Sequence, residues 1–324
     1  MKTVTMLASA LVALALLTQP ATAEDVAGGY SNWMGRNREL LKDRAVNDVT
    51  LLGSHDAATS DMNKDSPVCI GFKNDSGGRM KPFPSKKDIE KFKCQKASIK
   101  KQLLHGVRYL DLRVAYQDGE YWSHHGYLST RYQGPEGIFA QIRDFLKTNP
   151  DEVVILNMQH FYSDEHEMGT ADLARFYETV TSELGGLLIP GGKPTVKMGE
   201  IWQRQGRIVM IWSTDTKFSD PNNTVWDHRL LKDHWFRQKD RDFLIEELDG
   251  LVSDWRNDVD RDRFRELQAI QSSNKKIKSA PITNEMICQK VATDWKDAPI
   301  SIIMVNDSVN SGLMPLLMLK NGLK

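Results

Sequence analysis

The chain has 324 residues, of which 40% are hydrophobic and 27% are charged, enough for one large core or two small ones. Its 43 basic residues balance 43 acidic residues, so the overall charge favours neither nucleic acid nor a strongly anionic membrane surface as a partner. After the first 23 residues, no segment approaches the roughly 18 uninterrupted apolar residues of a membrane-spanning helix.

The first 23 residues have the features of an export signal. Lys2 supplies a positive charge, residues 6–17 are apolar, and Ala21 and Ala23 fit a cleavage site. An uncleaved anchor is the alternative, but the apolar stretch is short and ends before Pro20. We therefore expect a signal peptide at residues 1–23, one mature domain at residues 24–324, and a secreted or periplasmic location.

Strands and helices are expected to alternate along the mature chain. Apolar runs predict strands at residues 49–54, 107–115, 120–125, 153–158, 207–212 and 300–305. Helical spacing of apolar residues, with capping and stop signals, predicts helices at residues 31–45, 138–148, 171–184, 240–251 and 258–270. This alternation favours a parallel α/β architecture, and the length fits a single closed barrel.

Two of the predicted strands carry charged or titratable side chains. Successive strand residues point to opposite faces, so Asp111 and Arg113 share one face of the second strand. In the third strand the same rule separates His124 from His125. His125 lies at the end of its strand and is the better candidate for a functional site, whereas His124 is expected to have a structural role.

Other polar residues follow the ends of predicted strands. His55 and Asp56 come directly after the first strand, and Asp307 follows the last one. Barrel enzymes carry their catalytic residues at the C-terminal ends of their strands. A base, an acid and a fixed positive charge such as Arg113 can together cleave a phosphodiester without a metal ion. The sequence thus indicates a phosphodiesterase site.

Four segments together resemble a known family. They are GSHDAAT at residues 53–59, GVRYLDLR at 106–113, HHG at 124–126 and FLKTNPDEVVILNMQHFY at 145–162. In this order they resemble the X domain of phosphatidylinositol-specific phospholipases C, and the last is most similar to the stand-alone X-domain proteins. The resemblance implies an α/β fold with a single distorted TIM-like (β/α) barrel, and a phospholipid substrate reached at a membrane surface.

The resemblance also assigns roles to individual residues. His55 matches the base that takes a proton from the inositol 2-hydroxyl group, and His125 matches the acid that protonates the departing diacylglycerol oxygen. Asp56 and Asp111 match carboxylates that position the arginine and the histidines. Asp307 occupies the place of an aspartate that orients the base. The implied products are diacylglycerol and inositol 1,2-cyclic phosphate.

Arg113 determines the expected cofactor. Calcium-dependent members of the family carry an acidic residue at this position, whereas a guanidinium group can donate two hydrogen bonds to phosphoryl oxygens. We therefore expect the calcium-independent type, with no metal and no other cofactor. Simple bacterial members have a lysine near Gln159 and an arginine near Ser213. Gln159 can still bond a hydroxyl group and is our candidate substrate-binding residue.

The three cysteines fit an oxidising compartment incompletely. Cys69 and Cys94 flank a polar segment, and we expect a disulfide between them. Cys288 lies in an apolar-periodic stretch and is expected to be a buried free thiol. A structural zinc site is not expected, because there is no Cys-x-x-Cys spacing.

Two other functions compete with the phospholipase interpretation. Metal-dependent glycerophosphodiester or sphingomyelin phosphodiesterases share a barrel and two histidines, but they need a paired Glu-x-Asp metal site where Arg113 stands. A non-catalytic lipid- or sugar-binding module on the same barrel is the other alternative, because intact catalytic residues do not prove turnover.

Overall fold

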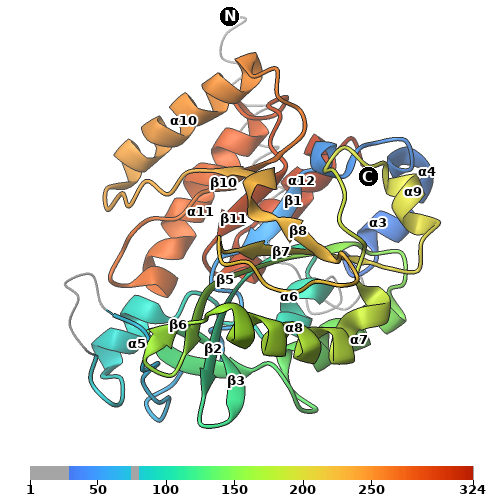
Figure 1. Ribbon diagram of the computed structural model, residues 1–324. Coiled ribbons are helices and arrows are strands. Elements are labelled where there is room, and N and C mark those ends of the chain that lie inside the picture. Colours follow the sequence, from blue (N-terminus) through green and yellow to red (C-terminus); the bar gives the residue numbers. More distant parts are fainter. Residues whose placement is uncertain (1–28, 74–79, 324) are drawn as a thin grey trace, which may run out of the picture.

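The computed structural model describes residues 29–73 and 80–323, and its centre is a curled parallel sheet (Figure 1). The predicted signal peptide, residues 1–23, lies outside the described residues. Eight strands follow one another in the order β8-β7-β5-β2-β1-β11-β10-β9, and every neighbouring pair in this order is parallel. Their bounds are β1 Leu51–Ser54, β2 Tyr109–Gln117, β5 Val154–Ser163, β7 Ile208–Ser213, β8 Val225–Asp227, β9 Leu231–Asp233, β10 Phe264–Gln268 and β11 Ile302–Val305.

The sheet confirms the predicted TIM-like α/β fold, although it is open rather than closed. In the part of the chain that the structure describes, hydrogen bonding does not continue from β8 to β9, the two ends of the strand order. Three further strands extend the sheet in antiparallel pairs: β3 Glu120–His125, β4 Tyr127–Arg131 and β6 His166–Glu167. The β3 strand pairs with the end of β2, so it carries His125 to the same edge as Arg113.

Helices cover the outside of the sheet. The green helices α7 and α8 lie side by side on one flank, and the orange helices α10 and α11 lie on another (Figure 1). The longer helices are α7 Ile138–Thr148, α8 Thr170–Leu184, α10 Arg241–Asn257, α11 Lys276–Ala292 and α12 Leu313–Lys320. The shorter ones are α3 Trp33–Arg36, α4 Arg38–Leu41, α5 Lys86–Phe92, α6 Ile99–Leu104 and α9 Met198–Trp202, with 3-10 turns η1 Val46–Asp48, η2 Gly185–Leu187, η3 His228–Leu230 and η4 Ser308–Asn310.

Apolar burial accounts for the central strands and the helices against them. The strand β7 is buried along Ile208 to Trp212, as expected of a parallel strand covered on both faces. Helix α7 buries Ile138, Ile142 and Phe145 at helical spacing. Each fully buried aliphatic or aromatic side chain stabilises the fold by roughly 1.5–3 kcal/mol. The core is therefore a rigid support for the polar edge above it.

One predicted element is wrong in type. The helix predicted at residues 258–270 is instead an extended segment containing strand β10, which pairs with β9 and β11. Its alternating charges are not a solvated helix face. Arg265 bonds the carboxylate of Asp258, while Glu266 is buried and accepts a hydrogen bond from Tyr109 at 2.9 Å.

The predicted disulfide is also wrong, because all three cysteines are free thiols. Cys69 is buried against Ala115 and Leu128, whereas Cys94 lies beside the carboxylate of Asp56. The two thiols thus occupy different packing environments. Cys288 is half-buried and donates to the carbonyl of Ser311 at 3.2 Å.

None of the described helices combines the length and the apolar character needed to cross a membrane.

Candidate active site

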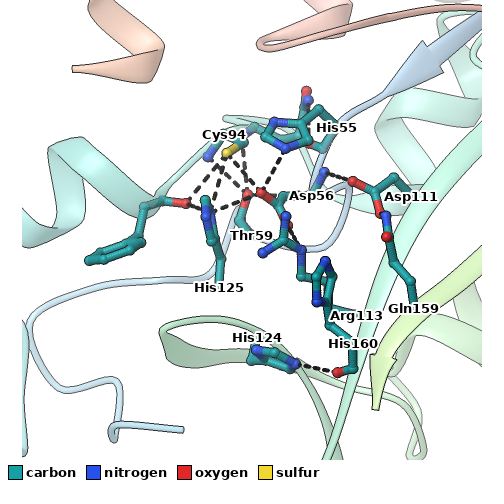
Figure 2. Close-up of polar contacts among 12 residues, drawn as sticks. His55, Asp56, Thr59, Cys94, Asp111, Arg113, His124, His125, Gln159 and His160 are labelled. Atoms are coloured by element: carbon teal, nitrogen blue, oxygen red, sulfur yellow. Dashed lines mark hydrogen bonds and ion pairs between the residues drawn. The ribbon is translucent and has the colours of Figure 1, made fainter. Parts of the chain in front are cut away.

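The site begins where strand β1 ends. Asp56 has a φ of 44°, in the left-handed region that few non-glycine residues adopt. Its backbone N–H donates to Asp111 Oδ2 at 2.8 Å, and the backbone N–H of His55 donates to the carbonyl of Val305 at 3.1 Å. Asp111 of β2 and Val305 at the end of β11 therefore hold this turn in place, and the side chains of His55 and Asp56 lie at the C-terminal edge of the sheet (Figure 2).

Asp56 is the centre of the site. Its Oδ1 lies 2.6 Å from Arg113 Nε, while its Oδ2 lies 2.9 Å from His125 Nδ1 and 3.1 Å from His55 Nε2. The carboxylate is buried. Burial opposes its charge, but Arg113 and the two histidines outweigh that effect and hold the pKa of Asp56 well below its usual range. Asp56 thus joins the predicted base, acid and fixed cation.

His55 is held on two further sides. Its Nδ1–H donates to Asn306 Oδ1 at 2.9 Å, and its ring stacks on Trp235 with centroids 5.5 Å apart and planes 28° apart. Burial lowers the pKa of His55 to about 4, although the Asp56 carboxylate acts in the opposite direction. The ring is therefore neutral near pH 7. Because Nδ1 carries the proton, Nε2 keeps a lone pair that can accept another.

Asp307 does not contact His55, the base that it was predicted to orient. The residue against His55 is Asn306, and the carboxylate of Asp307 instead binds Lys96 Nζ at 2.6 Å. The chain turns sharply here, since Asp307 has a φ of 49°. This turn directs the two consecutive side chains to different places, which the short motif after β11 did not reveal.

The paired histidines on β3 have separate environments. His125 Nδ1–H donates to the carbonyl of Phe92 at 2.6 Å, beside its contact with Asp56, and no partner of its Nε2 is found among the described residues. Figure 2 shows His124 apart from this group, bonded through Nε2 to the carbonyl of His160 at 2.9 Å. Its ring packs on Tyr162. The strand thus directs His125 to the site and His124 away from it.

Asp111 and Gln159 form the side of the site nearest strand β5. Asp111 Oδ1 accepts a hydrogen bond from Gln159 Nε2 at 2.5 Å, while its Oδ2 holds the backbone of Asp56. Burial and the charge of Asp56 raise the pKa of Asp111. Gln159 pairs in register with Arg113 across the two strands. The structure therefore places the predicted substrate-binding residue beside the cation.

Sequence reasoning missed several residues that line this group. Asn306 and Trp235 contact His55. Cys94 donates to Asp56 Oδ2 at 3.3 Å. The pKa of His125 is lowered mainly by burial and further by the charge of the buried Lys276. No local motif marks Trp235 or Lys276. Cys94 does carry a signal in the sequence, but that signal predicts half of a disulfide.

The site differs in its donors from a calcium cage. Calcium takes six to eight oxygen ligands, whereas here one oxygen of Asp56 faces Arg113 and both oxygens of Asp111 accept hydrogen bonds. The described residues do include a mixed set of nitrogen, oxygen and sulfur donors. Ligand atoms of His55, Asp56 and Cys94 all lie within 4.8 Å of one another.

Comparison with known families gives a match to one family model. Residues 86–184 match the family described as "Phosphatidylinositol-specific phospholipase C, X domain". This segment includes Asp111, Arg113, His125 and Gln159, while His55 precedes it. The resemblance recognised from the sequence motifs is confirmed.

Curated relatives carry related names. The chain is 26% identical over 237 residues to a "Variant-surface-glycoprotein phospholipase C" of Trypanosoma cruzi, covering 69% of this chain and 60% of that protein. It is 33% identical over 174 residues to a PI-PLC X-box domain-containing protein of Dictyostelium discoideum, covering 53% of this chain and 22% of that protein. The chain therefore spans less than two thirds of the length of these relatives.

Solved structures confirm the fold. A phosphatidylinositol-specific phospholipase C from Staphylococcus aureus superposes with a TM-score of 0.65 at 16% identity, covering 92% of this chain and 99% of that one. The corresponding enzyme from Listeria monocytogenes gives a TM-score of 0.62 at 13% identity, covering 90% of this chain and 98% of that one. At such identities the likeness concerns the fold alone.

Proposed function

Because this chain is related to the X-domain family of phosphatidylinositol-specific phospholipases C, we propose that it is a metal-independent phospholipase C. Its substrate is phosphatidylinositol or a related inositol lipid, glycosylated lipids included. The products are diacylglycerol and inositol 1,2-cyclic phosphate. The single observation that carries the proposal is the contact of one buried carboxylate, Asp56, with His55, His125 and Arg113.

His55 serves as the base. Its Nδ1–H is held by Asn306, so Nε2 has the free lone pair that takes a proton from the inositol 2-hydroxyl group. The resulting alkoxide attacks phosphorus. The imidazolium that forms lies 3.1 Å from Asp56, whose charge stabilises it. Trp235 fixes the plane of the ring by stacking on it.

His125 serves as the acid. Its Nδ1–H is held by Phe92 and Asp56, which leaves Nε2 to donate a proton to the departing diacylglycerol oxygen. Burial lowers the pKa of His125 in the free site, whereas a bound phosphodiester anion favours the protonated ring. The ring centroids of His55 and His125 are 6.1 Å apart, so the two rings do not compete for one proton.

Arg113 supplies the positive charge. The guanidinium forms its ion pair with Asp56 through Nε, and 14% of the Arg113 side chain is exposed. Its remaining N–H groups are donors for the phosphoryl oxygens, where negative charge increases in the transition state. In this proposal Arg113 replaces the calcium ion of the metal-dependent members.

The proposal includes export of the protein from the cytoplasm. Residues 1–23 are an export signal, so the mature protein works in the secreted or periplasmic space, and it reaches its lipid as a peripheral protein. Mass spectrometry of the protein recovered from the culture medium tests the cleavage after Ala23, and an intact N-terminus contradicts it.

A lipid panel tests the activity. Vesicles of phosphatidylinositol, a glycosylated phosphatidylinositol, phosphatidylcholine and sphingomyelin are incubated with the mature chain in excess chelator, and the soluble products are followed by phosphorus NMR. We expect inositol 1,2-cyclic phosphate from the inositol lipids only. Loss of all activity in chelator, restored by calcium, contradicts the role of Arg113.

The other outcomes distinguish the alternatives. Phosphocholine released from sphingomyelin identifies a phosphodiesterase of another headgroup class. Saturable vesicle binding without any phosphorus-containing product identifies a binding module on the same barrel.

A further inference from the structure

We propose that the site has a second ligand, a soft divalent cation such as Zn²⁺, bound by His55, Asp56 and Cys94, and that this ion inhibits the protein. The binding claim stands on the geometry of the three side chains. The inhibition claim rests on the proposed function.

The donor atoms are already close to a zinc arrangement. Asp56 Oδ2 lies 3.1 Å from His55 Nε2 and 3.3 Å from Cys94 Sγ, and the ligand atoms of the three residues are all within 4.8 Å of one another. Zinc bonds of about 2.0–2.3 Å with tetrahedral angles place donor atoms roughly 3.3–3.7 Å apart. Small side-chain shifts therefore suffice to bind the ion.

The proton positions also favour a cation at this point. His55 donates from Nδ1 to Asn306, so its unprotonated Nε2 faces an oxygen of Asp56 at 3.1 Å. Two acceptors at that distance repel each other unless a positive charge lies near both. A proton fills this role during turnover, and a metal ion can fill it at rest.

Asp56 can bind the ion without losing its other partner. Arg113 contacts Oδ1, whereas the metal site uses Oδ2. The Cys94 thiol releases its proton to solvent as the zinc–sulfur bond forms, so one thiolate and one carboxylate balance the divalent charge. His125 Nδ1 keeps its proton for the Phe92 carbonyl, so the fourth position belongs to water.

The donor set determines which ions bind. A thiolate, an imidazole and one carboxylate oxygen suit zinc or cobalt, whereas calcium and magnesium require oxygen donors. The positive charges of Arg113 and the buried Lys276 lie close by and limit the affinity. We therefore expect reversible inhibition by zinc and none by calcium or magnesium, because zinc occupies the lone pair of the base.

Cobalt binding tests the site without reference to activity. The chelator-treated mature chain is titrated with Co²⁺, and the thiolate-to-cobalt absorption band is recorded for the wild type, Cys94→Ser and Cys288→Ser. Cys288→Ser is the matched control, since that thiol is partly buried on α11 and bonds Ser311. We expect the band in the wild type and the control and its loss in Cys94→Ser. No band in the wild type, or a band that survives in Cys94→Ser, overturns the proposal.

Zinc inhibition tests the consequence. The zinc concentration for half-inhibition should rise at least about tenfold in Cys94→Ser relative to Cys288→Ser, since losing even an outer partner of a metal ligand costs 10–100-fold in affinity. An equal zinc response in both variants overturns the inhibition claim. If no lipid is cleaved at all, the proposed function fails while the cobalt titration still decides the site. If Cys94→Ser does not fold, His55→Asn replaces it and must also lose the cobalt band or shift it.

Discussion

Two arginine–carboxylate pairs, formed by Arg108 just before strand β2 and by Arg113 in the middle of it, are built differently. Arg108, just before the strand, contacts Glu152 through Nε at 2.8 Å and Nη2 at 2.6 Å, and neither side chain is exposed. Its other N–H groups donate to the backbone carbonyls of Tyr30, Ser31, Leu103 and Val107. The Arg108 guanidinium therefore has no donor left for a ligand.

Arg113, five residues along the same strand, has the opposite character. Among the described residues its ion pair is with Asp56, reached through Nε at 2.6 Å, and 14% of the side chain is exposed. Barrel proteins keep stabilising residues at the N-terminal face and catalytic residues at the C-terminal face. The Arg108–Glu152 pair, in which every guanidinium N–H group has a partner, fits a role in stabilising the fold. The Arg113–Asp56 pair, in which N–H groups remain available, fits a role in binding an anion.

The largest expected effect is at the C-terminal end of the barrel. His125→Asn should lower kcat by roughly 10²–10⁴-fold, the usual contribution of a general acid or base, with little change in Tm. His124→Asn on the same strand is the matched control and should change Tm more than kcat. The measurement is phosphatidylinositol cleavage beside thermal unfolding. Greater catalytic loss at His124 reverses the assignment of the two histidines.

The next largest effect is at the N-terminal end. Arg108→Met leaves Glu152 buried without its cation, so the free energy of unfolding should fall by about 3–5 kcal/mol. The activity per folded molecule should stay near that of the wild type. Chemical denaturation and an activity assay corrected for the folded fraction check both. An unfolding free energy equal to that of the wild type in Arg108→Met shows that the Arg108–Glu152 pair does not stabilise the fold.

The third effect contrasts Arg113 with Arg108 directly. Arg113→Met should raise the activation free energy by about 3–4 kcal/mol, as for loss of a strong oxyanion donor. Its unfolding free energy should fall less than that of Arg108→Met, because protonation of His55 or His125 can replace the charge beside Asp56. If Arg113→Met loses more stability than activity, Arg113 and Arg108 do not have the different roles proposed for them.

The fourth effect is a loss of stability in acid. Burial lowers the pKa of His55 to about 4 and that of His124 to about 3. Both values lie below the unfolded value near 6.5, so the unfolded chain binds more protons as the pH falls through this range. Each histidine should destabilise the fold by roughly 1.4 kcal/mol per pH unit between about pH 6 and pH 4. Urea unfolding against pH measures the slope, and His124→Asn should reduce it.

The smallest effect is expected for the pair of Lys96 with Asp307. The Lys96 side chain is half-exposed and Asn310 also donates to the buried Asp307 carboxylate, so Lys96→Met should change the unfolding free energy by about 0–1 kcal/mol. Asp307→Asn should keep most of the activity, whereas Asn306→Ala should lower kcat because it frees the His55 ring. Greater catalytic loss at Asp307 restores the role first predicted from the sequence.

Local patterns in the chain predicted most of the long strands and the faces of their side chains. The two-residue period of a strand is local, so it places Asp111 with Arg113 and separates His125 from His124. The motif order also predicted the family. The prediction was wrong at residues 258–270, where the spacing of charges suggested a helix. The segment instead forms strand β10, because it pairs with β9 and β11.

The distant residues that complete the site could not be predicted, because they meet only when the chain folds. Asn306 rather than Asp307 reaches His55, Trp235 stacks on the same ring, and Cys94 lies against Asp56 instead of forming a disulfide. These contacts join segments separated by tens to hundreds of residues. They depend on the curvature of the sheet and on one left-handed turn after β11, and neither leaves a periodic pattern in the chain.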